Sequence, residues 1–236
     1  MSGAPRRSQG RLAYSAEVNV GALLARSELL AALGPDALDQ LARASTQRDL
    51  ARGEVLFDQE DPGSELFMVC SGRIAMAKRS ADGRSSVVAL MEEEDLFGEM
   101  SLFDGKGRST EARALEPSVV VAVPYPAVKS ALAARPEALW TVVSLLVQRL
   151  RVTDEALADS MFLDVTGRTA KRILELAGSS DSFVLPVTQE ELAGMVGASR
   201  ERVNKAIATF CRLHWLELND RRYRILDRAK LAQRAV

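Results

Sequence analysis

The stretch TQEELAGMVGASRERVNKAIATF, residues 188–210, decides the fold of the C-terminal part of this chain. It predicts two short amphipathic helices separated by a tight turn, with Gly197 at the turn and Ser199 placed to cap the second helix. The apolar face is supplied by Leu192, Ala193, Val196, Val203, Ile207 and Phe210. Two helices joined in this way present the second one to the major groove of DNA. The sequence therefore predicts a helix-turn-helix.

The second of these helices opens with a polar face of Arg200, Glu201, Arg202, Asn204 and Lys205. Arg and Lys donate to guanine O6 and N7, and Glu accepts from cytosine N4, so this face matches base edges. The alternative is an ordinary surface helix of mixed charge. The turn and the caps favour DNA binding over that alternative.

Composition is that of a globular protein with one large or two modest domains: 236 residues, of which 47% are hydrophobic. The formal charge of −1 hides an asymmetry. Residues 164–236 carry 13 Lys and Arg against 9 Asp and Glu, a net +4, whereas residues 1–163 carry 18 against 23, a net −5. A basic module joined to an acidic one fits a DNA-binding domain with a separate sensor domain.

Several classes of protein are disfavoured. No apolar run approaches the roughly 18 residues that span a bilayer, and the N-terminus lacks the hydrophobic core of a signal peptide, so we expect a cytoplasmic protein without a membrane partner. Cys70 and Cys211 lie in apolar surroundings and are expected to be small core residues. With one histidine, His214, the sequence lacks the three or four ligands that a metal site needs. It also lacks a nucleophile–base pair, so we do not expect an enzyme.

Residues 52–125 have a different pattern, with turn residues about every ten positions. Between these turns the segments 55–57, 65–70, 73–78, 86–91 and 118–124 have strand character. Regular short strands predict a small antiparallel barrel or roll, and a sandwich without a ligand is the alternative. Leucine-rich short helices around the Gly34-Pro35 break are expected over residues 21–50, after a flexible leader at 1–20.

One segment inside the predicted roll, FGEMSLFDGKGRST (97–110), departs from the strand rhythm. Its glycines allow close approach of the backbone to a ligand, Arg108 can form a bidentate contact to a phosphate, and Glu99 can accept from a sugar hydroxyl. Such a pair fits a compact molecule with ribose and phosphate. The bare chemistry also fits a solvated turn.

A long helix is predicted from about residue 136 to 162. A seam recurs along it with 4-3 spacing, a heptad pattern that favours a two-stranded coiled coil across a homodimer. Its members are Leu139, Val143, Leu146, Leu150, Thr153, Leu157 and Ser160. Thr153 interrupts the apolar seam and is followed by Asp154. A polar residue at such a position can also serve to fix register.

Together, FGEMSLFDGKGRST, the helix segment RLRVTDE, the hinge FLDVTGR (162–168) and the motif TQEELAGMVGASRERVNKA resemble the CRP/FNR superfamily of bacterial transcription regulators over about residues 23–232. Within it the chain is similar to the cyclic-AMP receptor protein branch, because the cysteines of the iron-sulfur branch are missing. The resemblance implies an α+β fold with four parts. These are a leader (1–20), an antiparallel β-roll effector domain of the cyclic-nucleotide-binding type (21–135), a dimerisation helix with its hinge (136–163) and a winged helix-turn-helix (164–236).

The resemblance also implies residue roles. Arg108 and Ser109 would bind the cyclic phosphate, Glu99 and the Gly98 backbone the ribose 2′-hydroxyl, and Arg149 would reach toward the phosphate. Thr153 and Asp154, one from each subunit, would contact the base. At the DNA end the implied base contacts are Arg200, Glu201 and Lys205, and the implied phosphate contacts are Thr188, Gln189 and Ser199, with Arg221, Arg222 and Arg224 in a wing hairpin.

Two departures bear on the ligand. The Asp154 carboxylate can accept from the adenine N6 amine but also from guanine N1–H and N2–H₂, so cyclic AMP is the first expectation and cyclic GMP the second. The acidic run 92–95 stands where relatives usually carry a glycine turn. We therefore expect a homodimeric, allosteric regulator that binds a palindromic operator in double-stranded DNA, without a prosthetic group. The alternative is a regulator of this family with a degenerate pocket, independent of ligand or tuned to another effector. No pattern identifies a surface for RNA polymerase.

Overall fold

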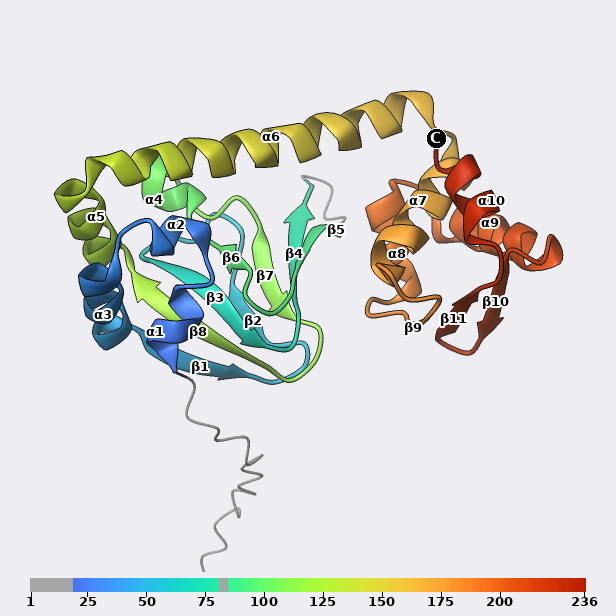
Figure 1. Ribbon diagram of the computed structural model, residues 1–236. Helices are drawn as coiled ribbons and strands as arrows, with labels where there is room; N and C mark the ends of the chain where they lie inside the picture. Colours follow the sequence, from blue (N-terminus) through green and yellow to red (C-terminus); the bar gives the residue numbers. More distant parts are fainter. Residues whose placement is uncertain (1–18, 81–84) are drawn as a thin grey trace, which may run out of the picture.

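The computed structural model describes residues 19–80 and 85–236, so almost all of the predicted leader at 1–20 lies outside the described residues. The described chain forms a β-roll with flanking helices, a long helix that crosses above the roll, and a small C-terminal domain beside it (Figure 1). The N-terminal helices are α1 (Val20–Leu24), α2 (Glu28–Ala31) and α3 (Pro35–Ala44). This arrangement confirms the predicted α+β fold.

Two four-stranded antiparallel sheets build the roll, in the orders β1-β8-β3-β6 and β2-β7-β4-β5. Five strands match the predicted segments: β2 (Val55–Phe57), β3 (Glu65–Ser71), β4 (Ile74–Arg79), β5 (Ser85–Met91) and β8 (Ser118–Pro124). Three strands were not predicted: β1 (Thr46–Leu50), β6 (Leu96–Phe97) and β7 (Glu111–Ala114). β1 and β7 are polar or alanine-rich, and β6 has two residues, so their own sequences carry little strand signal.

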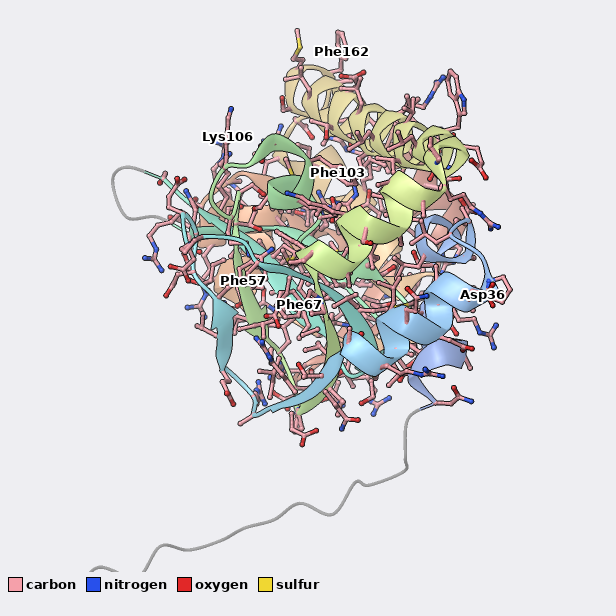
Figure 2. The ribbon with its side chains drawn as sticks, turned by 90° about the vertical axis from the view of Figure 1, so that its left-hand side faces the viewer. Asp36, Phe57, Phe67, Phe103, Lys106 and Phe162 are labelled. Carbon is pink, nitrogen blue, oxygen red and sulfur yellow. The ribbon has the colours of Figure 1, made fainter. Side chains whose placement is uncertain are left out.

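The inside of the roll is filled from both sheets. Phe57, Phe67 and Phe97 meet there with ring centroids 5.5–6.2 Å apart, and Figure 2 shows Phe57 and Phe67 between the strands. A second apolar cluster lies where α1–α3 and α5 (Tyr125–Ala134) cover the other side of the β1-β8-β3-β6 sheet. The segment 97–110, which we call the cassette, contributes one short helix, α4 (Met100–Asp104), on the side of the roll nearest the long helix.

The long helix α6 (Leu139–Phe162) follows α5 through the short 3-10 turn η1 (Pro136–Ala138). Val142 is buried against the roll, but most of the helix is exposed in the single subunit. Phe162, at its end, is 81% exposed and lies at the edge of the molecule in Figure 2. No single described helix has the length and apolar content needed to cross a membrane. The bent pair of α5 with η1–α6 meets those criteria only when its two pieces, which meet at 110°, are joined.

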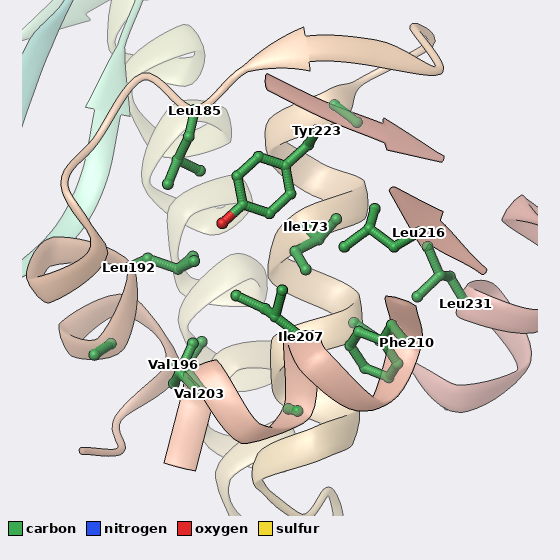
Figure 3. Close-up of a cluster of buried hydrophobic side chains, with 14 of the residues drawn as sticks. Ile173, Leu185, Leu192, Val196, Val203, Ile207, Phe210, Leu216, Tyr223 and Leu231 are labelled. Atoms are coloured by element: carbon green, nitrogen blue, oxygen red, sulfur yellow. The ribbon is translucent and has the colours of Figure 1, made fainter. Parts of the chain in front are cut away.

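The C-terminal domain contains α7 (Val165–Ala177), β9 (Ser182–Val184), α8 (Gln189–Val196), α9 (Arg200–Arg212), β10 (Leu216–Asn219), β11 (Arg222–Ile225) and α10 (Arg228–Arg234). The three strands pair in the order β10-β11-β9, which makes β10 and β11 the wing hairpin. Ile207 and Phe210 of α9 are buried with Leu192 of α8 and Tyr223 of β11 (Figure 3). A winged helix-turn-helix is therefore present where the sequence predicts it.

Both cysteines are free and half-buried. Burial raises the pKa of the Cys70 thiol to about 11 and also raises the pKa of Cys211. A thiol with a raised pKa is poorly reactive because the thiolate is the nucleophile. Both cysteines are therefore partly buried residues that pack against the apolar clusters, rather than the core residues that the sequence predicts.

The acidic run at 92–95 forms the turn between β5 and β6. Glu94 has φ 72°, in the left-handed region, and its backbone N–H donates to Val69 O at 2.9 Å. Only glycine adopts this conformation without a steric cost, so a non-glycine residue here is strained by about 1 kcal/mol. The turn geometry therefore explains why a glycine suits this position, and Glu94 occupies it under strain.

We predict that Glu94→Gly raises the free energy of unfolding by about 0.5–1 kcal/mol, because it relieves the left-handed strain. The Glu94 carboxylate pairs with Arg26 at 3.6 Å, but both side chains are more than half exposed, so the lost ion pair is worth little. Glu93→Gly is the matched control, since Glu93 does not have positive φ and glycine there should destabilise. Urea unfolding measures both variants. An equal loss of stability in both would contradict the prediction.

Candidate functional site

Gly98 places the cassette close to the roll. It follows β6 with φ +80°, and a Cβ atom at this position would lie 2.7 Å from Nη1 of Arg108. The Gly98 carbonyl accepts from that same Nη1 at 2.8 Å. A side chain at residue 98 would therefore displace the guanidinium, which explains why glycine stands here.

Arg108 is a buried cation, 4% exposed, held by backbone and aromatic groups from distant segments. Besides Gly98 O, it donates to Glu65 O at 2.7 Å and to Tyr125 Oη at 2.9 Å. Its Cζ lies 4.2 Å from the centroid of the Phe57 ring, a cation–π contact. Its Nε–H is buried and has no hydrogen-bond partner. The guanidinium is thus fixed in place by three of its five N–H groups, and the Nε–H and one Nη2–H remain available to an anion.

Tyr125, at the start of α5, completes this arrangement. Its hydroxyl accepts from Arg108 and donates to Gly98 O at 2.5 Å. Burial raises the pKa of Tyr125, and the Arg108 charge opposes that shift only in part, so the phenol stays protonated. Tyr125, Phe57 and the Glu65 carbonyl are not predicted by the sequence, because they lie 17 to 51 residues from Arg108 and no local signal connects them.

Glu99 is the second buried charge, fully enclosed at 0% exposure. One oxygen, Oε1, accepts from Arg149 Nη1 at 2.5 Å, and Arg149 also donates to Leu96 O at 3.0 Å. The other oxygen, Oε2, is buried without a partner. A buried carboxylate oxygen of this kind needs a donor, which a ligand hydroxyl can supply.

These groups share one cavity of about 890 Å³ between the roll and α6. Six of the seven predicted ligand residues line it: Gly98, Glu99, Arg108, Ser109, Arg149 and Thr153. Val88 and Met91 of β5, with Leu146 and Leu150 of α6, supply apolar walls. The Thr153 hydroxyl donates to Arg149 O at 2.9 Å, and Ser109 Oγ lies 3.5 Å from Met100 Sδ. The cavity thus combines an anion donor, a hydroxyl acceptor and an apolar wall for a flat ring.

The seventh residue, Asp154, does not line the cavity of its own subunit and is exposed. It stands on the exposed face of α6. Six large apolar side chains on that face are 44–76% exposed: Trp140, Val143, Val147, Leu150, Leu157 and Met161. With Asp154 between Leu150 and Leu157, these residues follow one another at alternating spacings of three and four. The predicted seam is therefore part of a wider exposed face of α6. Thr153 lies at the edge of this face, where the face borders the cavity.

The helix-turn-helix is built by local caps. Thr188 Oγ1 accepts from Glu191 N at 3.1 Å while the Glu191 carboxylate accepts from Thr188 N at 2.7 Å, a capping box at the start of α8. Gly197 ends α8 with φ +68°. Ser199 Oγ then accepts from Arg202 N and starts α9.

The predicted DNA contacts differ in how accessible they are. Arg200, Glu201 and Lys205 are exposed, and their side chains make no hydrogen bond or ion pair within residues 19–80 and 85–236. Thr188 and Ser199 are exposed at the helix N-termini. Gln189 is half-buried instead, and its amide donates to Tyr223 Oη at 2.8 Å. Gln189 therefore joins the helix-turn-helix to the wing.

The roll and the C-terminal domain of one subunit are in direct contact. Arg113 Nη2 of β7 lies 2.8 Å from Oε1 of Glu191, and Ser86 Oγ of β5 donates to Gly194 O at 2.8 Å. Burial by itself raises the pKa of Glu191, but the bonds from Thr188 and Arg113 outweigh it and hold that pKa below its usual value. The Glu191 carboxylate is thus ionised at neutral pH and serves both the capping box and the domain contact.

Comparison with known proteins agrees with this geometry. A model for the cyclic nucleotide-binding domain matches residues 47–135, and one for the Crp-like helix-turn-helix domain matches residues 167–234. The chain is 37% identical over 220 residues to a CRP-like cAMP-activated global transcriptional regulator of Mycobacterium tuberculosis, covering 90% of this chain and 98% of the relative. It is 30% identical over 159 residues to the cAMP-activated global transcriptional regulator CRP of Salmonella typhimurium, covering 64% of this chain and 76% of the relative.

Solved structures also resemble this chain over most of its length. The catabolite activator protein of Thermus thermophilus is 28% identical with a TM-score of 0.51, over 89% of this chain and 98% of that one. FixK2 of Bradyrhizobium japonicum has a TM-score of 0.73 at 18% identity, over 81% of this chain and 98% of that one, and so shares the fold. The relatives from Mycobacterium tuberculosis and Salmonella typhimurium are transcriptional regulators, so the chain is similar to regulators of transcription rather than to enzymes. With a cyclic nucleotide-binding roll joined to a Crp-like helix-turn-helix, this chain belongs to the CRP/FNR superfamily of DNA-binding transcription regulators.

Proposed function

We propose that this regulator is a cytoplasmic homodimer whose affinity for a palindromic operator is controlled by cyclic AMP, with cyclic GMP as the second candidate. One observation carries the proposal: Glu99 and Arg108 line the same cavity, and each has a buried polar atom without a partner, Oε2 of Glu99 and Nε of Arg108. A ribose hydroxyl and a cyclic phosphate supply the donor and the acceptor that these atoms lack. The named relatives are cAMP-activated, which supports the same ligand.

The mechanism follows from what borders the cavity. The ligand contacts the cassette through Glu99 and Arg108 and contacts α6 through Arg149 and Thr153. α6 runs on to the C-terminal domain, and β5, another wall of the cavity, reaches α8 through Ser86. Ligand binding then stabilises one position of the recognition helix α9. The ligand must bind the DNA-competent state more tightly than the other state, because equal affinity shifts no population.

A ligand-independent regulator is the second candidate. One observation favours it: three hydrogen bonds from Arg108 already go to Gly98, Glu65 and Tyr125 within the subunit. In that case the guanidinium serves to hold the cassette in place and the cavity has no nucleotide. Calorimetric titration with each cyclic nucleotide separates the two candidates.

We predict that wild-type protein binds cyclic AMP by calorimetry, and that saturating cyclic AMP raises its operator affinity. Arg108→Ala should weaken nucleotide binding by about 100-fold or more, since a charge-assisted bidentate contact is worth roughly 3 kcal/mol. The operator is obtained by selection on random duplexes with and without each nucleotide. Operator affinity that does not change with either nucleotide would contradict ligand control.

Two further variants show whether a loss of nucleotide binding comes from the missing side chain or from misfolding. Ser109→Ala removes an exposed hydroxyl of the cavity and should weaken nucleotide binding several-fold with an unchanged thermal midpoint. Lys106→Ala removes a cation from the same loop outside the cavity and should bind nucleotide as wild type does.

The dimer is predicted from the exposed face of α6. Val147 is 44% exposed there, and Val147→Asp would bury a carboxylate opposite its own copy, so we expect a monomer in sedimentation. Val55→Asp is the control, because Val55 is 42% exposed on β2 of the roll and should leave the dimer intact. A Val147→Asp protein that sediments as wild type would exclude α6 as the interface.

Base selectivity is predicted from Asp154. If Asp154 of the partner subunit contacts the base, its two oxygens match the two donors of guanine, whereas adenine N6 needs one acceptor. Asp154→Asn should then weaken cyclic GMP binding by about tenfold or more and cyclic AMP binding much less. Glu155→Gln, the neighbouring exposed carboxylate, should change neither affinity. Calorimetry with both nucleotides measures the ratio, and an unchanged ratio would exclude Asp154 from base contact.

A further inference from the structure

The last helix of the chain, α10, returns to the hinge (162–168) that joins α6 to the C-terminal domain. Only residues 226 and 227 separate it from β11 of the wing. Leu231, in the middle of α10, is fully buried in the core of the C-terminal domain. Figure 1 marks the C-terminus beside the junction of α6 and α7. The helix is therefore a short path from the wing to the hinge.

Arg234, the last residue of α10, binds the hinge at Asp164. Its Nη2 donates to both carboxylate oxygens of Asp164, which stands 70 residues earlier in the chain. A Cβ atom at Gly167 would lie 3.0 Å from the carbonyl oxygen of Arg234. Glycine at position 167 thus lets the end of α10 approach the first turn of α7 closely.

Asp164 also sets the break between α6 and α7. Leu163 and Asp164 have extended backbones, with ψ 137° and 174°, and so separate the two helices. The Asp164 carboxylate accepts from Gly167 N at 2.8 Å and thereby caps α7. The hydrogen bond from Gly167 and the contact with Arg234 lower the pKa of the Asp164 carboxyl, so it is ionised at neutral pH. One carboxylate therefore both starts α7 and receives the end of α10.

The first residue of α10, Arg228, makes a similar ion pair away from the hinge. Its Nε donates to Asp181 Oδ1 at 2.9 Å, and its other two nitrogens donate to backbone carbonyls of the loop after α7 at 2.9 and 2.8 Å. The side chains are 34% and 63% exposed in the Arg234–Asp164 pair and 37% and 66% exposed in the Arg228–Asp181 pair. Exposed pairs of this kind contribute little to stability. The two pairs therefore differ mainly in what they hold, and only the Arg234 pair holds the hinge.

The hinge is one of two connections between the nucleotide cavity and the C-terminal domain, and the other is the contact of β5 with α8. A hinge with several conformations absorbs a change in α6, whereas a hinge with one conformation turns the whole domain. We propose that α10 is a clamp on the hinge, in which Arg234 positions Asp164 and so makes operator affinity respond to the nucleotide. Arg234 is a positioning residue, because no residue of α10 lines the cavity. The proposal rests on the ligand control proposed above.

The coupling factor tests the clamp; it is the operator affinity with saturating cyclic AMP divided by the affinity without it. Arg234→Ala should lower this factor several-fold without abolishing it, since the contact of β5 with α8 remains. Arg228→Ala is the matched control: it removes an ion pair of the same kind from the same helix. It should lower the thermal midpoint about as much as Arg234→Ala does and leave the coupling factor unchanged. A purely structural role of Arg234 would give the result expected for Arg228→Ala.

Asp164→Asn separates the ion pair from the helix cap. Asparagine still accepts from the Gly167 N–H and is a good N-cap, but it carries no charge for Arg234. This variant should lower the coupling factor as much as Arg234→Ala does. The double variant should lower it no further, because both changes remove the same interaction. Arg234→Lys keeps the cation and should retain part of the wild-type coupling.

Hydrogen exchange at the amides of Gly167 and Arg168 gives a second readout, which needs neither nucleotide nor DNA. Exchange there should be several-fold faster in Arg234→Ala than in wild type and unchanged in Arg228→Ala. Equal coupling factors in these two variants, or unchanged exchange in Arg234→Ala, would overturn the clamp. If operator binding by wild type responds to neither cyclic nucleotide, the proposed ligand control fails by itself. The exchange comparison then still decides whether α10 holds the hinge.

Discussion

The ion pair between the buried Glu99 and the partly exposed Arg149 is the interaction on which the rest of the structure depends. It joins two segments 50 residues apart, the cassette and the long helix α6, across a carboxylate that is fully enclosed. Removal of Arg149 would leave this buried carboxylate without its cation, which is strongly destabilising. The pair leaves Glu99 Oε2 without a partner, and Arg108 Nε is the other buried atom of the site that lacks one. The same contact that closes the fold therefore prepares the cavity for a ligand.

The cavity is bordered by the two elements that reach the C-terminal domain. α6 runs directly into that domain, and β5 contacts α8 through Ser86, while Arg113 of β7, an inner strand of the same sheet, holds Glu191. Glu191 is also half of the capping box that starts the helix-turn-helix. A change at the cavity can thus be transmitted by the helix and by the sheet.

Two residues carry a carboxylate where another residue type would be more stable. Glu94 occupies a left-handed turn position that suits glycine, and its side chain lies at the cavity. Asp154 stands among the exposed apolar residues of α6, where a leucine or valine would stabilise a helix pair better. Both place a carboxylate near the site proposed for an anionic nucleotide, and both have a cost in stability. Such costs are typical of residues retained for function rather than for folding.

The sequence by itself determined the helix-turn-helix, the five clearest strands, the long helix and six of the residues that line the cavity. These signals are local: caps, turns and apolar periodicity are encoded within a few residues. Tertiary structure alone decided that Tyr125, Phe57 and Glu65 hold Arg108, that Gln189 binds Tyr223, and that β7 completes the second sheet. These pairings join distant segments, and their geometry depends on how the whole chain closes, which no local pattern records.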